Sequence, residues 1–475
     1  MLLRDGIAMN NKNASENTKV PRQINYNTVW RWHFYAGVFC IPFAIWLSIT
    51  GAIYLFKPQI ENWLDAPYDN LTVVASAKPS QQVQAALAAV PNTVLNAYEM
   101  PRSSHSAIRI LVGKDKELTR VYVHPQTLEI LKITEEDDRL MRFIFKLHGE
   151  LLMGDKGSML VELAASWMII LIITGLYLWY PRNANGIAGI LYPRLTYGGR
   201  IFWRDIHSVT GLWVSIFLLF LLISGLPWAK SWGGMLKQVR QIAQTSQSQQ
   251  IKQDWTTGTT SEMLQRKESN TPMQQSNTNN HSEHGAHTSS YTIVDYTPLN
   301  EMVDNVTLEN LAPPAYISPP SKAGASWSAR SDSQNRPLRA TLKLDETTRQ
   351  VIERKDFAQR PLLDRIIGFG VAAHEGQLFG WFNQLLGLLT AIATLLLGIS
   401  SIVLWWSRRP AGTLGAPKAK SYPLPIYIGI LIVLLGCLLP LLGISLLIIL
   451  FIEVTLLCRV ELIRNFLGLA KRGTL

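Results

Sequence analysis

The chain alternates long apolar runs with long polar segments. Four of the runs are long enough to cross a bilayer, which takes about 20 mostly apolar residues. They are residues 30–56, 159–180, 211–228 and 385–406. A fifth apolar region, residues 424–457, is too long for one span and contains Pro440 near its middle. A hairpin that turns at Pro440 would give two arms of about 16 residues each, slightly short for a bilayer.

Basic residues flank the runs and predict the orientation of the chain. Lys and Arg gather before the first run, between the second and third, and after the fourth, and such flanks stay in the cytoplasm. A hairpin at Pro440 returns the basic C-terminal tail to the same side, so we expect six spans rather than five. The predicted cytoplasmic segments are residues 1–29, 181–206, 407–423 and 458–475. The long segments 57–147 and 229–370 then face the other compartment.

Composition agrees with a membrane protein. Only 17% of the 475 residues are charged, against about 25% in a soluble domain. Much of the net charge of +11 comes from the flanks of the apolar runs, so it does not indicate nucleic acid as a partner. The three cysteines lie in or beside apolar runs and predict no disulfide framework. Residues 1–28 are polar and predict no cleavable signal peptide.

The chain aligns with itself. Residues 138–180 align without a gap on residues 364–406, and residues 33–51 align on residues 207–225. The predicted unit is therefore a span, an outer domain and a second span, used twice in the same orientation. The fold class that follows is an α-helical membrane bundle of about six spans with two small α+β outer domains.

Both outer segments have the patterns of small α+β modules. In the first, residues 79–89 predict a helix, and the predicted strands are residues 107–112, 120–123 and 128–133. In the second, residues 338–344 and 350–354 predict strands around a turn. Residues 245–290, rich in Gln, Ser, Asn and Thr, have no apolar face and predict a disordered insert.

Four of the nine histidines stand at equivalent places in the two repeats: His33, His148, His207 and His374. With the histidine segments included, the later spans occupy residues 148–180, 207–228 and 371–406. Ionisable groups at membrane depth are costly and are functional candidates. Neutral imidazole is a common axial ligand of haem iron, so His33/His207 near the cytoplasmic face and His148/His374 near the outer face predict two haem sites. The alternative is four interfacial histidines that bond backbone carbonyls.

Arginines and glycines near these histidines suit the same interpretation. Arg31 and Arg204 could pair with haem propionates near the cytoplasmic face, and Arg139 and Arg365 could do so on the outer side. The positive-inside rule alone is enough to explain Arg31 and Arg204. Glycines at equivalent places let a flat ring approach the backbone, or simply let helices pack. They are Gly37, Gly51, Gly211 and Gly225.

The outer histidines require a break in the helix. A continuous helix from His148 to Trp179 would be about 46 Å long, against a hydrocarbon core of about 30 Å. We expect the chain to break and fold the histidine back toward the bundle at Gly154 and Gly157, and in the second unit at Gly376 and Gly380. A separate group, His281, His284 and His287 with Glu283, could bind a divalent metal, although weak adventitious binding in a disordered insert explains it as well.

These paired motifs resemble the PepSY-associated transmembrane helix family. The resemblance rests on His33 and Gly37 in the first span, the Pro125-Gln126-Thr127 turn, Leu147-His148-Gly149, Leu178-Trp179, and the repetition of the set from about residue 30 to residue 457. Arg31-Trp32-His33 replaces the family's commoner His-Arg-Trp order.

The resemblance implies a bacterial inner-membrane protein with two b-type haems, ligated by His33, His148, His207 and His374. The family includes reductases of ferric siderophores such as ferrioxamine. The substrate implied is therefore a ferric siderophore in the periplasm, with membrane lipid around the spans. No nicotinamide, flavin or nucleotide motif is present, so electrons must come from quinol or a cytoplasmic reductase.

Two other functions stay open at this point. A haemless carrier of chelate or metal would rock two halves about a site at mid-membrane, where Glu162 is the one clear ionisable residue. Alternatively, the outer modules could bind or inhibit a protease or envelope partner, with the spans serving only as an anchor.

Overall fold

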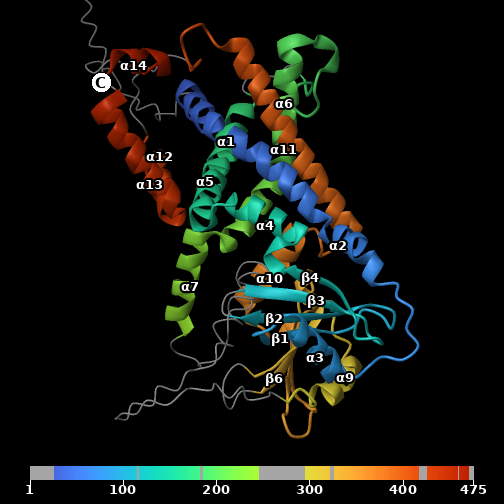
Figure 1. The fold of residues 1–475 in the computed structure, drawn as a ribbon. Coiled ribbons are helices and arrows are strands. Elements are labelled where there is room, and N and C mark those ends of the chain that lie inside the picture. Colours follow the sequence, from blue (N-terminus) through green and yellow to red (C-terminus); the bar gives the residue numbers. More distant parts are fainter. Residues whose placement is uncertain are drawn as a thin grey trace, which may run out of the picture.

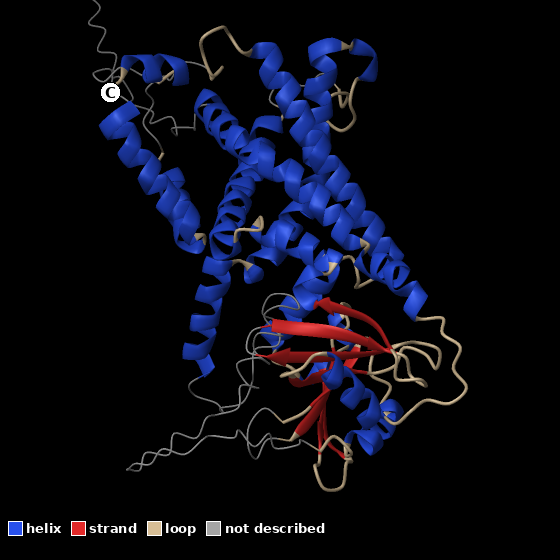
Figure 2. Cartoon of the chain, in the orientation of Figure 1, coloured by secondary structure: helices blue, strands red, loops and turns tan. Residues whose placement is uncertain are grey.

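The computed structural model describes residues 26–114, 117–181, 186–244, 295–320, 326–416, 425–457 and 459–469. A bundle of long helices stands on one antiparallel sheet domain (Figures 1 and 2). The predicted insert at residues 245–290, with its three histidines, lies outside the described residues.

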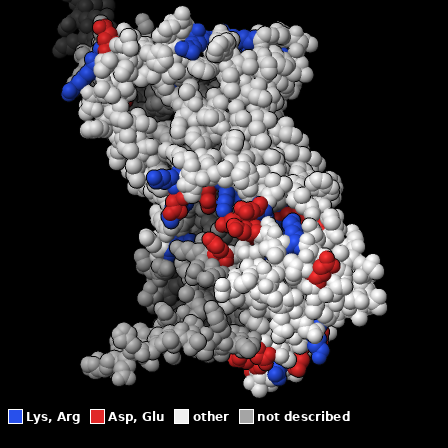
Figure 3. Space-filling view, viewed as in Figure 1, with Lys and Arg blue, Asp and Glu red and all other residues white. Residues whose placement is uncertain are grey.

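Four long helices make up the bundle. They are α1 (Tyr26–Leu55), α5 (Gly154–Trp179), α6 (Gly199–Gly225) and α11 (Trp381–Arg408). Each is long and apolar enough to cross a membrane, as the hydropathy pattern predicted. On the face shown in Figure 3, the wall of the bundle is almost free of charged side chains, while Lys and Arg gather at the end away from the sheet.

The last apolar region forms two short helices. They are α12 (Ile426–Leu438) and α13 (Pro440–Ile452), which continues through residues 453–457 and is followed by α14 (Glu461–Leu467). Leu439 between them has ψ 84°, outside the helical range, and Gly436 and Gly443 bring the two backbones into contact. The amide of Leu414, ahead of α12, donates to the carbonyl of Phe466 at 2.9 Å. The contact between Gly436 and Gly443 folds α12 and α13 into a helical hairpin, in which residues 440–457 are long and apolar enough to cross a membrane and α12 is shorter.

The described outer segments form one sheet rather than two separate modules. Its strand order is β4-β3-β2-β1-β5-β6-β7-β8, and every pairing is antiparallel. The first four are β1 (Val94–Glu99), β2 (Ile108–Lys114), β3 (Glu117–Val123) and β4 (Ile130–Glu135). The others are β5 (Ala315–Ser318), β6 (Trp327–Ser331), β7 (Ala340–Leu344) and β8 (Val351–Asp356).

The two halves of the sheet meet at β1 and β5. Tyr98 pairs with Ile317 and Glu99 with Tyr316. An edge strand has unpaired backbone groups, and this pairing removes one such edge from each half. The two predicted α+β modules are thus joined edge to edge in one sheet.

Helices cover both faces of the sheet. On one face, α3 (Pro79–Ala89) and α9 (Leu299–Leu308) pack over an apolar core that contains buried Val83, Ile110 and Met302. Between the other face and the bundle lie α2 (Lys57–Asp65), α4 (Leu140–Glu150) and α10 (Leu362–His374) (Figure 1). The predicted helix at residues 79–89 is confirmed.

The chain breaks between the histidine segments and the spans that follow. Leu151, Leu152 and Gly154 separate α4 from α5 with positive φ angles, and Gly376 and Gly380 do the same between α10 and α11. Such angles favour glycine and end a helix. The predicted break therefore occurs in both units, although Gly157 lies within α5, and α4 and α10 are separate helices at the sheet end of the bundle.

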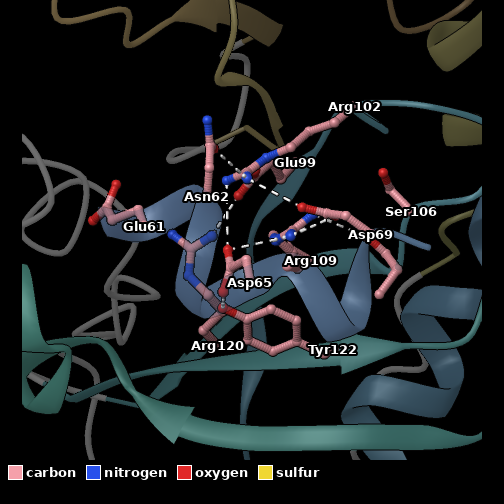
Figure 4. A network of polar contacts seen from close by, with 12 residues as sticks. Glu61, Asn62, Asp65, Asp69, Glu99, Arg102, Ser106, Arg109, Arg120 and Tyr122 are labelled. Carbon is pink, nitrogen blue, oxygen red and sulfur yellow. Dashed lines mark hydrogen bonds and ion pairs between the residues drawn. The ribbon is translucent and has the colours of Figure 1, made fainter. Parts of the chain in front are cut away.

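A buried ion-pair network fixes the sheet to the bundle (Figure 4). Arg109 on β2 binds Asp65, the last residue of α2, and Asp69, shortly after it, at 3.2 and 2.7 Å. Arg120 on β3 binds Glu99 and also Glu136, just ahead of α4, the latter at 2.8 Å. Because each guanidinium joins a strand to a helix near the bundle, the network holds the start of α4 in place.

Candidate functional site

His33 on α1 and His207 on α6 face each other inside the bundle. Their ring centroids are 6.3 Å apart, and the ring planes are inclined by 81°. Two imidazoles that bind one metal ion from opposite sides, at metal–nitrogen distances of ~2 Å, have ring centres roughly 6 Å apart. The separation therefore suits a shared metal.

Both rings line an open cavity of about 910 Å³. It extends from Arg204 and Arg408 at the end of the bundle to Leu218 and Thr394 near its middle. The walls come from all four long helices and include Gly37 and Gly211. Since these glycines have no side chain, the cavity has room for a flat group beside each imidazole.

Hydroxyl groups on the neighbouring helices hold both rings. His33 Nδ1 lies 3.0 Å from Thr174 Oγ1 on α5. His207 Nδ1 lies 3.2 Å from both Ser400 Oγ and Ser401 Oγ on α11. In each ring this contact uses Nδ1, so Nε2 is the nitrogen left to face a ligand.

The second pair repeats this arrangement at the sheet end of the bundle. His148 Nδ1 lies 2.9 Å from Thr50 Oγ1 on α1, and His374 Nδ1 lies 2.9 Å from Ser224 Oγ on α6. Each ring passes a glycine so closely that an added Cβ would lie 3.1 Å from His148 at Gly51 and 3.5 Å from His374 at Gly225. The folded-back helices thus place both outer histidines at the sheet end of the bundle, each against a hydroxyl of a long helix.

A pair of imidazoles fits haem better than a bare metal ion. A structural zinc site takes four protein ligands, and the described residues contain no group of three or more His, Cys, Asp or Glu side chains placed to hold an ion. A haem supplies the equatorial nitrogens itself and needs only axial ligands. The residues present, with Nδ1 engaged and glycines alongside, fit that group at both pairs.

Arginines at the cavity mouth can pair with carboxylates. Arg204 lines the cavity and donates to Asp205 at 2.8 Å, which leaves its guanidinium half-exposed. Arg194, also at the cavity, holds the same buried Asp205 at 2.7 Å. Arg408 on α11 lines the cavity as well, and the sequence analysis did not single it out because it was counted among the flanking basic residues.

Arg31 and Arg139 have partners within the protein, and their pairing with haem propionates stays a prediction. Arg31 donates to the carbonyl of Gly468, beyond α14, at 2.9 Å and to Tyr35 at 3.3 Å, and it does not line the cavity. Arg139 holds Glu136 at 2.7 Å and Glu61 at 2.9 Å in the ion-pair network. Both guanidiniums therefore hold protein groups in place. Arg365 keeps a buried Nε with no hydrogen-bond partner among the described residues.

Glu162, the ionisable residue within a span, has a structural role. Its carboxylate accepts hydrogen bonds from the backbone amides of Ser231 and Trp232, the closest at 2.9 Å. These amides begin α7 (Lys230–Gln244), and a helix N-terminus favours a negative charge. Glu162 therefore caps a helix, and this contact gives no support to a carrier site at mid-membrane.

The hydroxyl partners are the functional residues that sequence reasoning missed. The alignment that pairs His33 with His207 also pairs Thr50 with Ser224, and the alignment that pairs His148 with His374 also pairs Thr174 with Ser400. A search of the repeats for matching polar residues, rather than for histidines alone, would have found them.

Comparison with known proteins agrees with this architecture. The family model described as the PepSY-associated TM region matches residues 30–408, which include the four long helices and all four histidines. No curated protein matches the chain. The matched region covers most of the 475 residues, and its apolar helices make the chain a multi-pass membrane protein. The protein belongs to the PepSY-associated TM region family.

Proposed function

We propose that the protein is a dihaem b-type reductase of the bacterial inner membrane, which moves electrons outward to a ferric siderophore in the periplasm. The observation that carries the proposal is the pairing of four histidines at two depths. Each pair takes one ring from each half of the chain, and each ring has Nδ1 engaged by a hydroxyl. In this proposal His33/His207 hold the inner haem and His148/His374 the outer one.

The topology belongs to the same proposal. Six spans are supported by the hydrogen bond between Leu414 and Phe466, which joins the two ends of the α12–α13 hairpin. A duplicated unit is supported by the matching hydroxyl contacts of the four rings. The basic residues at the cavity mouth support a cytoplasmic position for that end, which puts the sheet domain in the periplasm.

The chemistry needs little from the protein beyond holding the groups. Haem supplies one-electron transfer. Hard anionic oxygens of a hydroxamate-type chelate hold Fe(III) far more tightly than Fe(II), so one electron releases the metal and returns the free chelate. The histidines would hold the two haems between which the electron moves, and the apolar helices exclude water between the two sites. Quinol or a cytoplasmic reductase supplies the electron on the inner side.

The cavity supports the inner site of this scheme. It opens toward Arg204 and Arg408, where positive charge can meet the carboxylates of a bound haem. Helices α1 and α6 each link the two sites, since the rise along α1 from His33 to Thr50, the partner of His148, is about 26 Å. One continuous helix therefore sets the depth of both sites.

An absorption spectrum of the purified protein, with and without dithionite, tests the proposal directly. We expect a b-type spectrum, with half the haem lost when either histidine of a pair is changed to Ala. His105→Ala is the matched control, because His105 is exposed on a loop of the sheet domain. A folded but colourless protein would refute the proposal.

A second experiment separates reduction from carriage. Full-length protein in liposomes, with quinone that dithionite reduces to quinol inside, should release Fe(II) from an external ferric hydroxamate, and a ferrous-specific chelator can measure it. The four His→Ala variants should lose this activity. Uptake of intact labelled chelate without any reductant would favour a carrier instead. If cells that carry the His→Ala variants keep an unchanged cell envelope, the result would favour an interaction role for the sheet domain.

A further inference from the structure

Each of the four paired histidines meets a hydroxyl whose own proton is already used. Thr174 donates to the carbonyl of Ile170 at 2.7 Å, one turn earlier on α5. The other three do the same on their own helices, at 2.7 to 3.0 Å. They are Thr50 to Trp46, Ser224 to Phe220 and Ser400 to Leu397.

This proton count fixes which ring nitrogen carries a hydrogen. A Ser or Thr hydroxyl has one proton to donate, and its oxygen can still accept. Because the proton goes to the helix carbonyl, the oxygen can only accept from the imidazole. A neutral imidazole has one N–H, so Nδ1 is protonated and Nε2 carries the free electron pair.

We propose that Thr50, Thr174, Ser224 and Ser400 are positioning residues, which hold the four histidines in one tautomer, Nδ1 protonated and Nε2 free to bind iron. The binding of iron by Nε2 rests on the proposed function, while the tautomer itself does not. Groups that fix the second nitrogen of a metal-bound histidine also raise the basicity of the ligand.

The two halves differ at one position of this arrangement. Gly175, next to Thr174, approaches the His33 ring so closely that an added Cβ would lie 3.2 Å from it. The equivalent residue beside Ser400 is Ser401, whose hydroxyl lies 3.2 Å from His207 Nδ1 and donates its own proton to Leu397 at 2.7 Å. His207 therefore has two acceptor hydroxyls and His33 has one. Loss of Ser400 alone should therefore have a smaller effect than loss of Thr174.

The tautomer can be measured without haem. Full-length protein labelled with ¹⁵N-histidine and prepared free of haem should show, by solid-state NMR in lipid, a protonated Nδ1 and an unprotonated Nε2 for the signals that disappear in His33→Gln. In Thr174→Val, which keeps the shape but not the hydroxyl, we expect both tautomers. Thr174→Ser keeps the hydroxyl and should restore the single tautomer. An Nδ1 without hydrogen in the unchanged protein would overturn the proposal.

Haem-loaded protein gives a second readout, which also covers the case of a haem-free protein that does not fold. Thr174→Val should lose ~10- to 100-fold in haem affinity, the usual effect of removing such a partner, and should raise the midpoint potential of the inner site because a less basic ligand favours ferrous iron. Ser400→Ala should lose less haem affinity than Thr174→Val, because Ser401 still contacts His207, and Ser400→Ala with Ser401→Ala should behave like Thr174→Val.

The two ideas fail separately. A normal potential and haem affinity in Thr174→Val, with haem present, would refute the positioning role and leave the reductase intact. The expected tautomers in a protein that never binds haem would support the positioning role and refute the reductase.

Discussion

Changing Glu136 to Gln should loosen the sheet where it meets α4. Burial alone would raise the pKa of Glu136, but the adjacent Arg120 and Arg139 outweigh it and hold the pKa at about 2, against an ordinary 4.5. At 1.36 kcal/mol per unit, this difference corresponds to about 3 kcal/mol of stability at neutral pH. Removing one partner of a buried ion pair costs a similar 3–5 kcal/mol.

Hydrogen exchange measured by mass spectrometry on the full-length protein can detect this loss. About 3 kcal/mol corresponds to a fall of roughly two orders of magnitude in the protection of β3 amides in Glu136→Gln at pH 6. Glu135→Gln is the matched control, because Glu135 is an exposed neighbour. The folded-state pKa is depressed, so this stability is present above about pH 4.5 and is lost as the pH falls toward 2.

The effect of the variant should therefore shrink as the solution is acidified. In the unchanged protein, β3 protection should fall over the same interval, as Glu136 takes up its proton. Equal protection of β3 in Glu136→Gln and in Glu135→Gln at pH 6 would refute the reasoning, and so would a difference between them that stays constant down to pH 2.

Three further changes test the site. Gly51→Ala would bring a Cβ to 3.1 Å from His148, so the EPR signal of the outer haem should shift, whereas Gly149→Ala meets nothing within 4 Å and should leave it unchanged. Arg408→Gln should lower the midpoint potential of the inner haem, because the loss of a positive charge beside it favours ferric iron. A charge interaction of about 1 kcal/mol corresponds to ~40 mV for one electron, and an unchanged potential would place Arg408 away from the haem. Glu162→Ala should raise exchange at the start of α7 by an amount equivalent to about 2 kcal/mol, the value of hydrogen bonds to a charged group, and should leave both haem spectra intact; loss of haem there would contradict its capping role.

Hydropathy predicted the long helices well, because a membrane span needs only length and apolar character. Residues 30–56 correspond to α1 (Tyr26–Leu55), and glycines marked the breaks ahead of α5 and α11. The strands β1, β5 and β6 were not predicted. β1 carries Asn96 and Glu99 toward a buried interior, so its sequence lacks the apolar alternation on which strand prediction depends.

The histidine pairs could be predicted from the repeat, whereas the arginine roles could not. Equivalent positions in two aligned halves imply equivalent places in space, so His33 and His207 were expected to meet. Basic residues at membrane ends all satisfy the positive-inside rule, and nothing in the sequence distinguishes Arg31 from Arg408. The difference arises from α14, whose end reaches back to Arg31 and occupies it.

The ligand count also bears on why the chain has two halves. A half of the chain offers one imidazole at each depth, His33 and His148 in the first and His207 and His374 in the second, while a haem clamped on both sides needs two. Neither half could then complete a site alone, and both sites form only when the halves associate, with α1 packed against α11 and α5 against α6. Because the sheet halves join through β1 and β5, the same association is fixed outside the membrane. The contact between the halves is thus part of the function we propose, and a change that separates β1 from β5 should weaken the outer pair before the inner one.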